Sequence, residues 1–337
     1  MKKKINSNNI LLLITIALFV VMYIGGCIMY ADKGFPNLQT FLNILINNAG
    51  LICTTCGMTC VMLTGGIDIS VGSVVAMDCM FIAVGIEKWG WSSKKLMLMV
   101  LVIGIILGAI QGYLIAYAQI QPFIVTMAGM FFARGMTAVI CKDQVSISSD
   151  DFFNKLATAK VELPFGAYTN NKGILMTPYV RITVVIAVIV LVAIFLMLRY
   201  TKFGRGLYAV GGNQQSATLM GLNVKKTTMC AYILSGFLTS IGGICYCLNT
   251  MAGTVSQATG FEMSAISSSV IGGTLLTGGV GNVIGSFFGV LINGTISQLV
   301  KFNGQLVASW ANIVTAMLLC FFIVLQAIFA KLKEIKK

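Results

Sequence analysis

The chain has 337 residues, of which 57% are hydrophobic and only 10% charged, with a formal net charge of +13 and no histidine. Soluble domains are about 45–50% apolar and about 25% charged, and a soluble core cannot absorb so much apolar surface, whereas a lipid bilayer can. The composition therefore excludes a soluble globular protein. The positive charge gathers at the ends of apolar segments, which indicates membrane anchoring rather than nucleic-acid binding.

Ten apolar segments are candidates for membrane spans, because a transmembrane helix needs about 20 mostly apolar residues. In chain order they are residues 10–30, 41–63, 70–86, 96–118, 122–140, 179–198, 229–248, 263–277, 280–300 and 307–330. The segments that begin at Ser70 and Met263 are short or interrupted by glycine, so either one could be re-entrant. The sequence predicts an all-α integral membrane protein of about ten transmembrane helices, with residues 1–337 forming a single transmembrane domain.

The distribution of Lys and Arg predicts the orientation in the membrane. With the N-terminus inside, twelve of these residues fall on cytoplasmic segments and five on the short outer loops. This bias favours a cytoplasmic N-terminus and a cytoplasmic C-terminus. The cytoplasmic clusters include Lys2, Lys3 and Lys4 at one end and Lys336 and Lys337 at the other.

Residues 141–178 form the one long outer insertion that the pattern predicts. Its polarity comes from Asp143, Asp150, Asp151, Asn170 and Asn171. The insertion is too short to be an independent domain. We expect it to cover the outer mouth of the transmembrane helices.

The stretch 63–72 interrupts two apolar segments and contains Thr64, Gly65, Gly66, Asp68 and Ser70. Glycines allow backbone turns that side chains forbid, and broken helices at membrane depth occur where protein or a water-filled cavity covers the backbone. A charge at the bilayer centre costs about 2.5–3.5 kcal/mol on insertion scales. Two interpretations stay open: the stretch lines a translocation path, or it is a short cytoplasmic turn in which Asp68 or Ser70 caps the next helix.

A second glycine-rich interruption lies at 271–282 and shares the string Leu-Thr-Gly-Gly with the first. It contains two glycine pairs, Gly272 with Gly273 and Gly278 with Gly279. Paired interruptions in the two halves of a chain are typical of internally repeated transporters. Close helix packing through small residues explains the glycines equally well.

Residues 199–228 form the longest predicted cytoplasmic connection. The stretch 211–221 predicts one short helix, because Asn213 is a suitable N-cap and Gly221 stands where a helix commonly ends. A polar helix between two spans has no task in the membrane, so it suits docking to a cytoplasmic partner. An ordinary connecting loop is the alternative.

No group of residues indicates catalysis or metal binding. Asp78 and Arg134 are isolated charges that could mark an ion pathway or be satisfied at helix ends. There is no histidine and no Gly-x-x-x-x-Gly-Lys-[Ser/Thr] phosphate-binding loop. We therefore expect no enzyme activity, no catalytic residues, no metal site and no cofactor bound by this chain.

Four motifs closely resemble the permease subunits of bacterial ABC sugar importers, the group for ribose, xylose, arabinose and galactosides. The resemblance covers roughly residues 40 to 325, in the order and spacing of that family. The motifs are 63–72, Gln121-Pro122-Phe123-Ile124-Val125-Thr126-Met127 with Arg134-Gly135, Tyr200-Thr201-Lys202-Phe203-Gly204-Arg205 followed by Gly211-Gly212-Asn213, and Val270-Ile271-Gly272-Gly273-Thr274 with Gly278-Gly279.

The resemblance implies a role and a set of partners. The chain would be a multi-pass protein of the bacterial plasma membrane that passes a monosaccharide by alternating access. It would work with a second permease copy, identical or a paralogue, with a separate ATPase that binds ATP, and with an extracytoplasmic sugar-binding protein, all surrounded by membrane lipid and without nucleic acid.

The resemblance also implies site residues. The translocation path would be lined by Thr64, Gly65, Gly66, Asp68, Ser70, Gly272, Gly273, Gly278 and Gly279. The coupling contact with the ATPase would be made by Asn213, Gln214, Gln215, Leu219, Met220 and Gly221.

Two departures from the family pattern leave the solute open. Acidic residues of the family are replaced by Gln214 and Gln215, and the usual Leu-Asp-Ala-Ile-Ala after Glu262 is replaced by residues 263–267, Met-Ser-Ala-Ile-Ser. The same machinery could carry a nucleoside, a furanose-type autoinducer or a branched amino acid. A different class, an ion-coupled secondary transporter working through Asp68 or Asp78, also stays open.

Overall fold

The computed structural model describes residues 7–164, 166–169, 175–307 and 309–335. Lys2, Lys3, Lys4, Asn170, Asn171, Lys336 and Lys337 lie outside the described residues. The helices are α1 Ser7–Met29, the 3₁₀ turn η1 Ala31–Lys33, α2 Leu38–Leu63, α3 Val71–Glu87, α4 Ser93–Ala116, α5 Pro122–Ile140, α6 Asp151–Thr158, α7 Ile182–Tyr200, α8 Lys202–Gly212, α9 Gln214–Leu219, α10 Val224–Thr250, α11 Phe261–Ile271, α12 Val283–Asn303 and α13 Ser309–Ile335.

Eight of the described helices are long and apolar enough to cross a membrane, namely α1, α2, α4, α5, α7, α10, α12 and α13. The two shorter helices, α3 of 17 residues and α11 of 11 residues, lie where the sequence predicts short or broken spans. The all-α membrane architecture is therefore confirmed.

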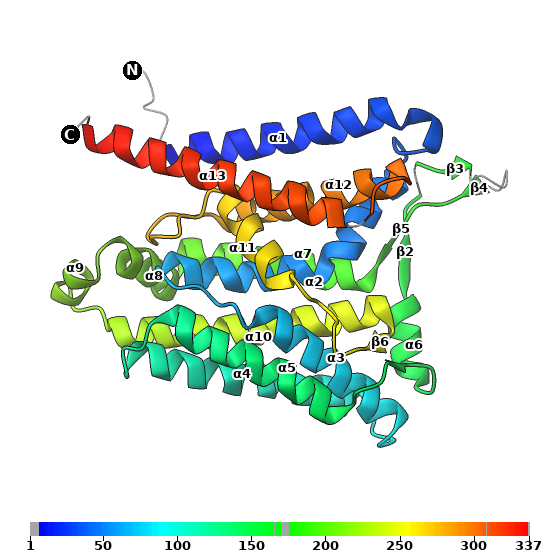
Figure 1. Ribbon diagram of the computed structural model, residues 1–337, viewed down its shortest axis with the longest axis horizontal. Coiled ribbons are helices and arrows are strands. Elements are labelled where there is room, and N and C mark those ends of the chain that lie inside the picture. The colour runs from blue at the N-terminus through cyan, green and yellow to red at the C-terminus, as the bar shows by residue number, and fades with distance from the viewer. Residues whose placement is uncertain (1–6, 165, 170–174, 308, 336–337) are drawn as a thin grey trace.

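The long helices run side by side, and the short elements collect at their two ends (Figure 1). α1 begins and α13 ends at the end that carries α8 and α9. The opposite end carries α6 and the strands β2 to β5. The two helical termini thus lie on one side, and the bias of Lys and Arg predicts that this side is cytoplasmic.

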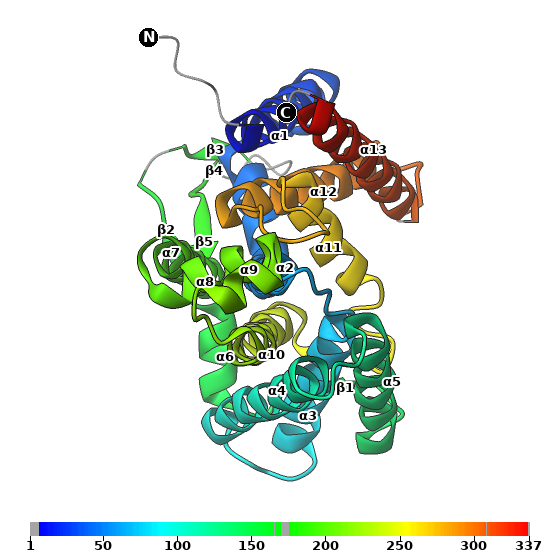
Figure 2. The ribbon, with the colours of Figure 1, turned by 90° about the vertical axis from the view of Figure 1, so that its left-hand side faces the viewer.

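Helices α2, α10 and α12 form the interior of the bundle, whereas α1, α5 and α13 are mostly exposed. Viewed from the end that carries α9, α5, α11 and α13 lie along one side of the molecule (Figure 2). The exposed side chains of α5 and α13 include Phe131, Phe132, Met317 and Phe321. Such apolar surface is suited to lipid or to another membrane protein.

Glycines bring α4 and α10 into close contact. Gly104, Gly108 and Gly112 repeat every four residues on α4, and a Cβ on Gly108 or Gly112 would meet backbone atoms of Tyr232 or Met229. Small residues at this spacing let two helix backbones approach closely inside a membrane. The α4–α10 pair is therefore held by shape rather than by polar bonds.

The outer insertion consists of α6 and short strands. β1 Val145–Ser146 pairs with β6 Ala252–Gly253, β2 Lys160–Glu162 with β5 Tyr179–Arg181, and β3 Tyr168–Thr169 with β4 Leu175–Met176, all antiparallel. The prediction that a span begins at residue 179 was wrong, because residues 179–181 pair with β2 and α7 starts at Ile182.

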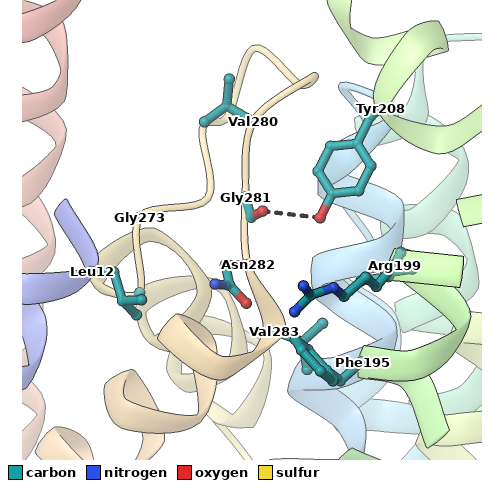
Figure 3. A pocket seen from close by; sticks show the side chains of 11 residues that line it. Leu12, Phe195, Arg199, Tyr208, Gly273, Val280, Gly281, Asn282 and Val283 are labelled. Atoms are coloured by element: carbon teal, nitrogen blue, oxygen red, sulfur yellow. Dashed lines mark hydrogen bonds between the residues drawn. The ribbon is translucent and has the colours of Figure 1, made fainter. Parts of the chain in front are cut away.

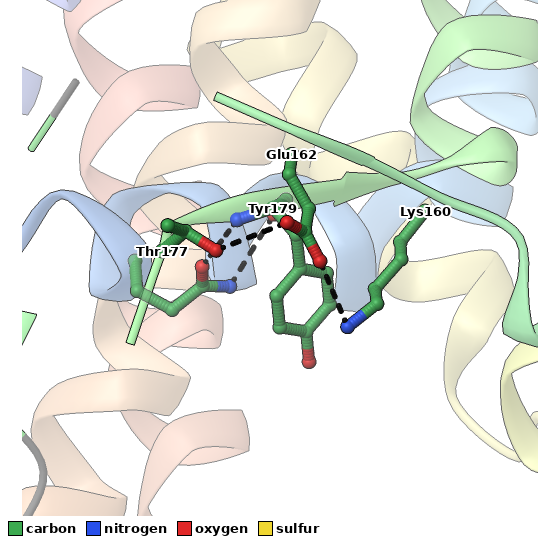
Figure 4. A network of polar contacts seen from close by, with 5 residues as sticks. Lys160, Glu162, Thr177 and Tyr179 are labelled. Carbon is green, nitrogen blue, oxygen red and sulfur yellow. Dashed lines mark hydrogen bonds and ion pairs between the residues drawn. The ribbon is translucent and has the colours of Figure 1, made fainter. Parts of the chain in front are cut away.

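Side chains fasten this insertion to the transmembrane helices. Gln39 at the start of α2 accepts a hydrogen bond of 2.8 Å from the backbone N–H of Tyr179. Near it, Glu162 pairs with Lys160 at 3.2 Å and accepts a hydrogen bond from Thr177 (Figure 4). Most of these groups are exposed, so each contact contributes little.

Asp150 joins the insertion to α4. Its carboxylate caps α6 by accepting from the backbone N–H of Phe153 at 2.8 Å, and it accepts from the N–H of Ser93 at 3.2 Å. Partial burial acts to raise the pKa of Asp150, but these hydrogen bonds outweigh it and leave the pKa below its ordinary value of 3.8.

Candidate functional site

The predicted short helix at the cytoplasmic end is present as α9. Asn213 caps it, because its side-chain oxygen accepts from the backbone N–H of Ser216 at 2.8 Å. At the other end Gly221 has φ +81°, its N–H donates to the carbonyl of Thr218, and the next N–H donates to that of Ala217. This is the Schellman ending that favours glycine. Both capping residues were predicted from the sequence.

The tip of α9 is apolar and uncharged. Leu219 is 89% exposed and Met220 is 69% exposed, and Gln214 and Gln215 on the same helix are also exposed. Two adjacent apolar side chains are thus open to solvent at the end of this short polar helix.

Helix α8, which precedes α9 and contains Gly211 and Gly212, was not predicted from the sequence. Thr201 caps α8 by accepting from the N–H of Gly204 at 3.0 Å. The helix buries Leu207 and Val210 against the membrane domain. The spacing of Phe203, Leu207 and Val210 is the amphipathic signal that could have identified it.

Three separate segments meet at glycines just inside the cytoplasmic end. We call this contact the glycine junction and define it by Leu63, Gly65, Gly211, Gly278 and Gly279. The N–H of Gly279 donates to the carbonyl of Leu63 at 2.9 Å. A Cβ on Gly278 would lie 2.7 Å from the nitrogen of Gly65 and 3.0 Å from the Cα of Gly211. A Cβ on Gly211 would overlap both Leu63 and Gly279. No side chain fits between these backbones.

The two Leu-Thr-Gly-Gly strings adopt different local backbone structures. Gly65, at φ +82°, ends α2 in a Schellman motif, with N–H groups of Gly65 and Gly66 bonded to the last turn of the helix. Gly278 and Gly279, at φ +85° and +73°, form a turn inside the α11–α12 loop instead. The strings therefore do not show a structural repeat, but they touch each other at the junction.

Asp68 lies inside the turn between α2 and α3. It is 2% exposed. One oxygen accepts from the backbone N–H and the hydroxyl of Ser70, at 3.1 and 2.6 Å, and the other accepts from the hydroxyl of Ser235 on α10, at 2.9 Å. Every oxygen of this carboxylate is engaged, so the geometry favours the structural interpretation of Asp68 over a place on the path.

A groove of about 870 Å³ brings predicted path residues next to predicted coupling residues. Thr64, Gly65 and Gly66 line this groove, and Gln214 and Gln215 line it as well. The α4–α5 turn closes the groove with Gln119, Ile120, Gln121 and Pro122. The groove opens beside the exposed tip of α9.

A smaller cavity of about 310 Å³ lies between α1, α7, α8 and the α11–α12 loop (Figure 3). Tyr208 of α8 donates to the carbonyl of Gly281 at 3.1 Å, and Arg199 extends toward Asn282. Asn282 itself caps α12 by accepting from the N–H of Ile284. Helix α8 is thus bonded to the loop that also carries Gly278 and Gly279.

The comparison with known families decides what kind of protein this is. Residues 40–323 match the family described as the permease component of the branched-chain amino acid transport system. The chain belongs to this permease family.

Curated relatives cover nearly the whole permease. It is 40% identical to the inner membrane ABC transporter permease protein YjfF of Escherichia coli, over 94% of this chain and 92% of the relative. It is 32% identical to the fructose import permease protein FruG of Bifidobacterium longum, over 96% and 92%, and 34% identical to the ribose import permease protein RbsC of Escherichia coli, over 84% and 83%. No solved structure matches the permease.

Three of the serines that follow Glu262 in this permease face no opening, whereas Ser264 borders a cavity at the outer end. Ser267, Ser268 and Ser269 are fully buried. Asn293 of α12 donates to the hydroxyls of Ser267 and Ser268 at 3.0 and 2.9 Å, and Ser269 lies 3.2 Å from the hydroxyl of Thr59 on α2. The hydrogen bonds of Ser267, Ser268 and Ser269 hold α11 against its neighbouring helices, so these three serines are structural.

The two isolated charges of the permease lie on different helices and do not pair. Asp78 on α3 is fully buried, and neither of its oxygens has a hydrogen-bond partner among the described residues. Arg134 on α5 donates to the carbonyls of Val255 and Gln257 at 2.8 and 2.7 Å. Arg134 is thus satisfied by the outer loop between α10 and α11, and the two residues form no continuous relay.

Proposed function

We propose that this chain is the membrane-spanning subunit of an ABC importer that passes a monosaccharide across the bacterial plasma membrane. Membership of the permease family and the ribose and fructose permeases among the relatives support this assignment. The observation that carries it is the capped helix α9, with an exposed apolar tip, packed beside the glycine junction. The chain makes and breaks no covalent bond.

In this proposal a separate ATPase subunit docks on α9 and residues 199–228 act as the coupling loop. Asn213 and Gly221 fix the ends of the helix, and Gln214, Gln215, Leu219 and Met220 face the ATPase. The contact is apolar and neutral, so its strength depends on burial rather than on ion pairs. The chain itself binds no cofactor, because ATP is held by the partner.

Motion of α9 would reach the helices through α8. Gly211 at the end of α8 touches the end of α2 and the α11–α12 loop, and Tyr208 bonds the same loop. Interiors packed this closely transmit displacement because they have no free volume to absorb it. The junction would therefore convert docking and ATP hydrolysis into alternating access.

We place Thr64, Gly65, Gly66, Ser70, Gly272, Gly273, Gly278 and Gly279 at the cytoplasmic part of the path and assign Asp68 to holding the turn that presents them. A second permease copy would complete the path against the side formed by α5, α11 and α13, with lipid around the rest. The insertion 141–178 and its continuation into β5 would meet the sugar-binding protein that delivers the solute.

The test is a pull-down of the tagged permease from mild detergent, with identification of the proteins that co-purify. We expect an ATP-hydrolysing subunit, and we expect its recovery to fall at least tenfold when Leu219→Asp and Met220→Asp are combined. The matched control is Leu306→Asp with Val307→Asp, two adjacent exposed apolar residues in the α12–α13 loop at the opposite end.

A chain that is folded, purifies alone and transports in liposomes under an ion gradient would contradict the proposal. That outcome would favour an ion-coupled secondary transporter. A second outcome is that the ATPase is recovered and the importer takes up a nucleoside, an autoinducer or a branched amino acid but no sugar. That outcome would support the ABC importer and contradict the monosaccharide.

A further inference from the structure

A polar cavity of about 550 Å³ lies at the outer end of the molecule. It is bordered by the last turns of α10, the α10–α11 loop, the start of α11 and the start of α13. We call it the outer pocket. Its volume falls within the roughly 300–1,000 Å³ of small-molecule sites. It lies at the opposite end from the glycine junction, and α11 and α13, which supply part of its lining, lie along one side of the molecule (Figure 2).

The outer pocket is polar but uncharged. Among the described residues that line it, none carries a formal charge. A charged solute calls for a counter-charge in a site near the membrane, because an unpaired charge is costly to desolvate. The lining therefore selects a neutral solute.

Several lining groups are free to bind a solute. In the described part of the chain the side chains of Gln144, Ser256 and Asn312 make no hydrogen bond, although each borders the cavity. An amide offers both donors and an acceptor, and a hydroxyl offers one donor and two acceptors. Together these three groups match a molecule that carries many hydroxyls.

The backbone around the pocket is fixed in advance. Gln257 is 9% exposed and bonds the N–H of Thr254 and the hydroxyl of Thr250 with the two ends of its amide. Arg134 holds the same loop through two carbonyls. A site held in place before binding loses less entropy when the solute arrives.

An aromatic pair forms one wall. The rings of Tyr246 on α10 and Phe261 on α11 meet edge to face, with centroids 5.6 Å apart at 89°. Both residues border the cavity. Aromatic side chains give a small-molecule site a rigid apolar surface, and a few polar groups around them fix orientation. A sugar ring has one face of C–H groups and a rim of hydroxyls that fit such a wall.

We propose that the outer pocket is a transient binding site for a monosaccharide, occupied after release from the binding protein and before passage toward the cytoplasm. The site takes the sugar as a neutral polyol, with Gln144, Ser256 and Asn312 on its hydroxyls and the Tyr246–Phe261 pair against its ring. This inference rests on the proposed function and adds the place at which the permease itself recognises the solute.

The experiment uses the complete importer in proteoliposomes, with permease, ATPase and binding protein, and radiolabelled D-ribose, D-fructose and D-galactose as probes. The test variant combines Gln144→Leu with Asn312→Leu, which replaces two amides by branched aliphatic side chains and removes their hydrogen-bonding groups. The matched control is Gln305→Leu, an exposed glutamine in the α12–α13 loop outside the pocket. Ser256→Lys, which introduces a charge at an exposed position, provides a second independent variant.

We expect the double variant and Ser256→Lys to lower uptake of the transported sugar at least tenfold at subsaturating concentration and to raise KM, with ATPase recovery and thermal stability unchanged. The control is expected to stay within twofold of wild type. If both pocket variants keep the ATPase and take up sugar within twofold of wild type, the proposed binding site is overturned and the permease assignment stands. If wild type binds its ATPase but transports none of the three sugars, the pocket assignment and the monosaccharide fall together. Loss of the ATPase from wild type would instead contradict the permease assignment itself.

Discussion

The two ends of the transmembrane domain are built in opposite ways. At the cytoplasmic end, Gly211, Gly278 and Gly279 bring three backbones together with no room for a methyl group. At the outer end, hydrogen bonds of the side chains of Arg134 and Gln257 fix the α10–α11 loop beside a cavity of about 550 Å³. At the cytoplasmic end the backbones touch because glycine has no side chain, whereas at the outer end side-chain hydrogen bonds fix a loop that borders a cavity.

This difference separates two tasks. A close-packed contact passes on a displacement with little loss, because protein interiors are barely compressible. A roomy polar cavity can hold a solute and water but transmits motion poorly. On our two proposals, mechanical coupling would belong to the cytoplasmic end and solute recognition to the outer end, and changes at the two ends are expected to differ in severity.

The largest effect is expected for Gly211→Ala. The new methyl would overlap the backbone at Leu63 and Gly279, and overpacking of this kind typically costs about 1–3 kcal/mol. Uptake should fall at least tenfold because the junction is forced apart. Transport in proteoliposomes and thermal unfolding in detergent measure the two consequences.

The neighbouring Gly212→Ala is the matched control, because no atom lies within 4 Å of its added Cβ. Both glycines occupy the last turn of α8, so the gain in helix propensity is the same for both. Equal loss of uptake in the two variants would show that the junction does not depend on close contact at Gly211.

An intermediate effect is expected for Asp68→Asn. The amide nitrogen of Asn cannot accept a hydrogen bond, so either Ser70 or Ser235 loses its acceptor. We expect the free energy of unfolding to fall by about 1 kcal/mol. Uptake per folded molecule should remain within twofold of wild type, because Asp68 is buried in its turn. A variant of normal stability that no longer transports would place Asp68 on the path and weaken the contrast between the two ends.

The smallest effect is expected at Asp150 on the outer end. Its folded pKa is lowered by hydrogen bonds from the N–H groups of Phe153 and Ser93, although burial opposes them. A lowered carboxyl pKa adds stability above the ordinary value of 3.8, and this stability is lost as pH falls through the folded pKa. Hydrogen exchange of α6, corrected for the intrinsic effect of pH, should therefore lose protection below about pH 4.

Asp150→Asn should remove that pH dependence while leaving sugar uptake at neutral pH within twofold of wild type. A collapse of transport in this variant would mean that the outer insertion is as tightly coupled to the helices as the glycine junction is.

The sequence was sufficient to locate the long spans, though not every boundary, because hydropathy is a local property. The predicted end of α2 at residue 63 and the limits of α5 at 122 and 140 agree with the structure. The caps Asn213 and Gly221 were predictable for the same reason, since a cap depends on residues three or four positions away.

The sequence was not sufficient for contacts between distant segments. The glycines of the junction are visible as pairs, but only the fold brings Gly65 within reach of Gly278. Ser267 and Ser268 are neighbours in the sequence, but only the fold shows that their partner Asn293 comes from a different helix. The outer pocket joins Gln144 to Asn312, residues too far apart in sequence for any periodicity to relate.

The short length of α11 has a consequence for how the membrane is sealed against ions. Eleven residues rise about 16 Å as a helix, roughly half of the 30 Å hydrocarbon thickness. Beyond Ile271 a glycine-rich loop, held by contacts such as the bond between Gly279 and Leu63, would have to complete the seal against ions. A loosened seal there would appear first as a leak of protons and small ions through a resting importer, and the cell would lose membrane potential before it lost sugar.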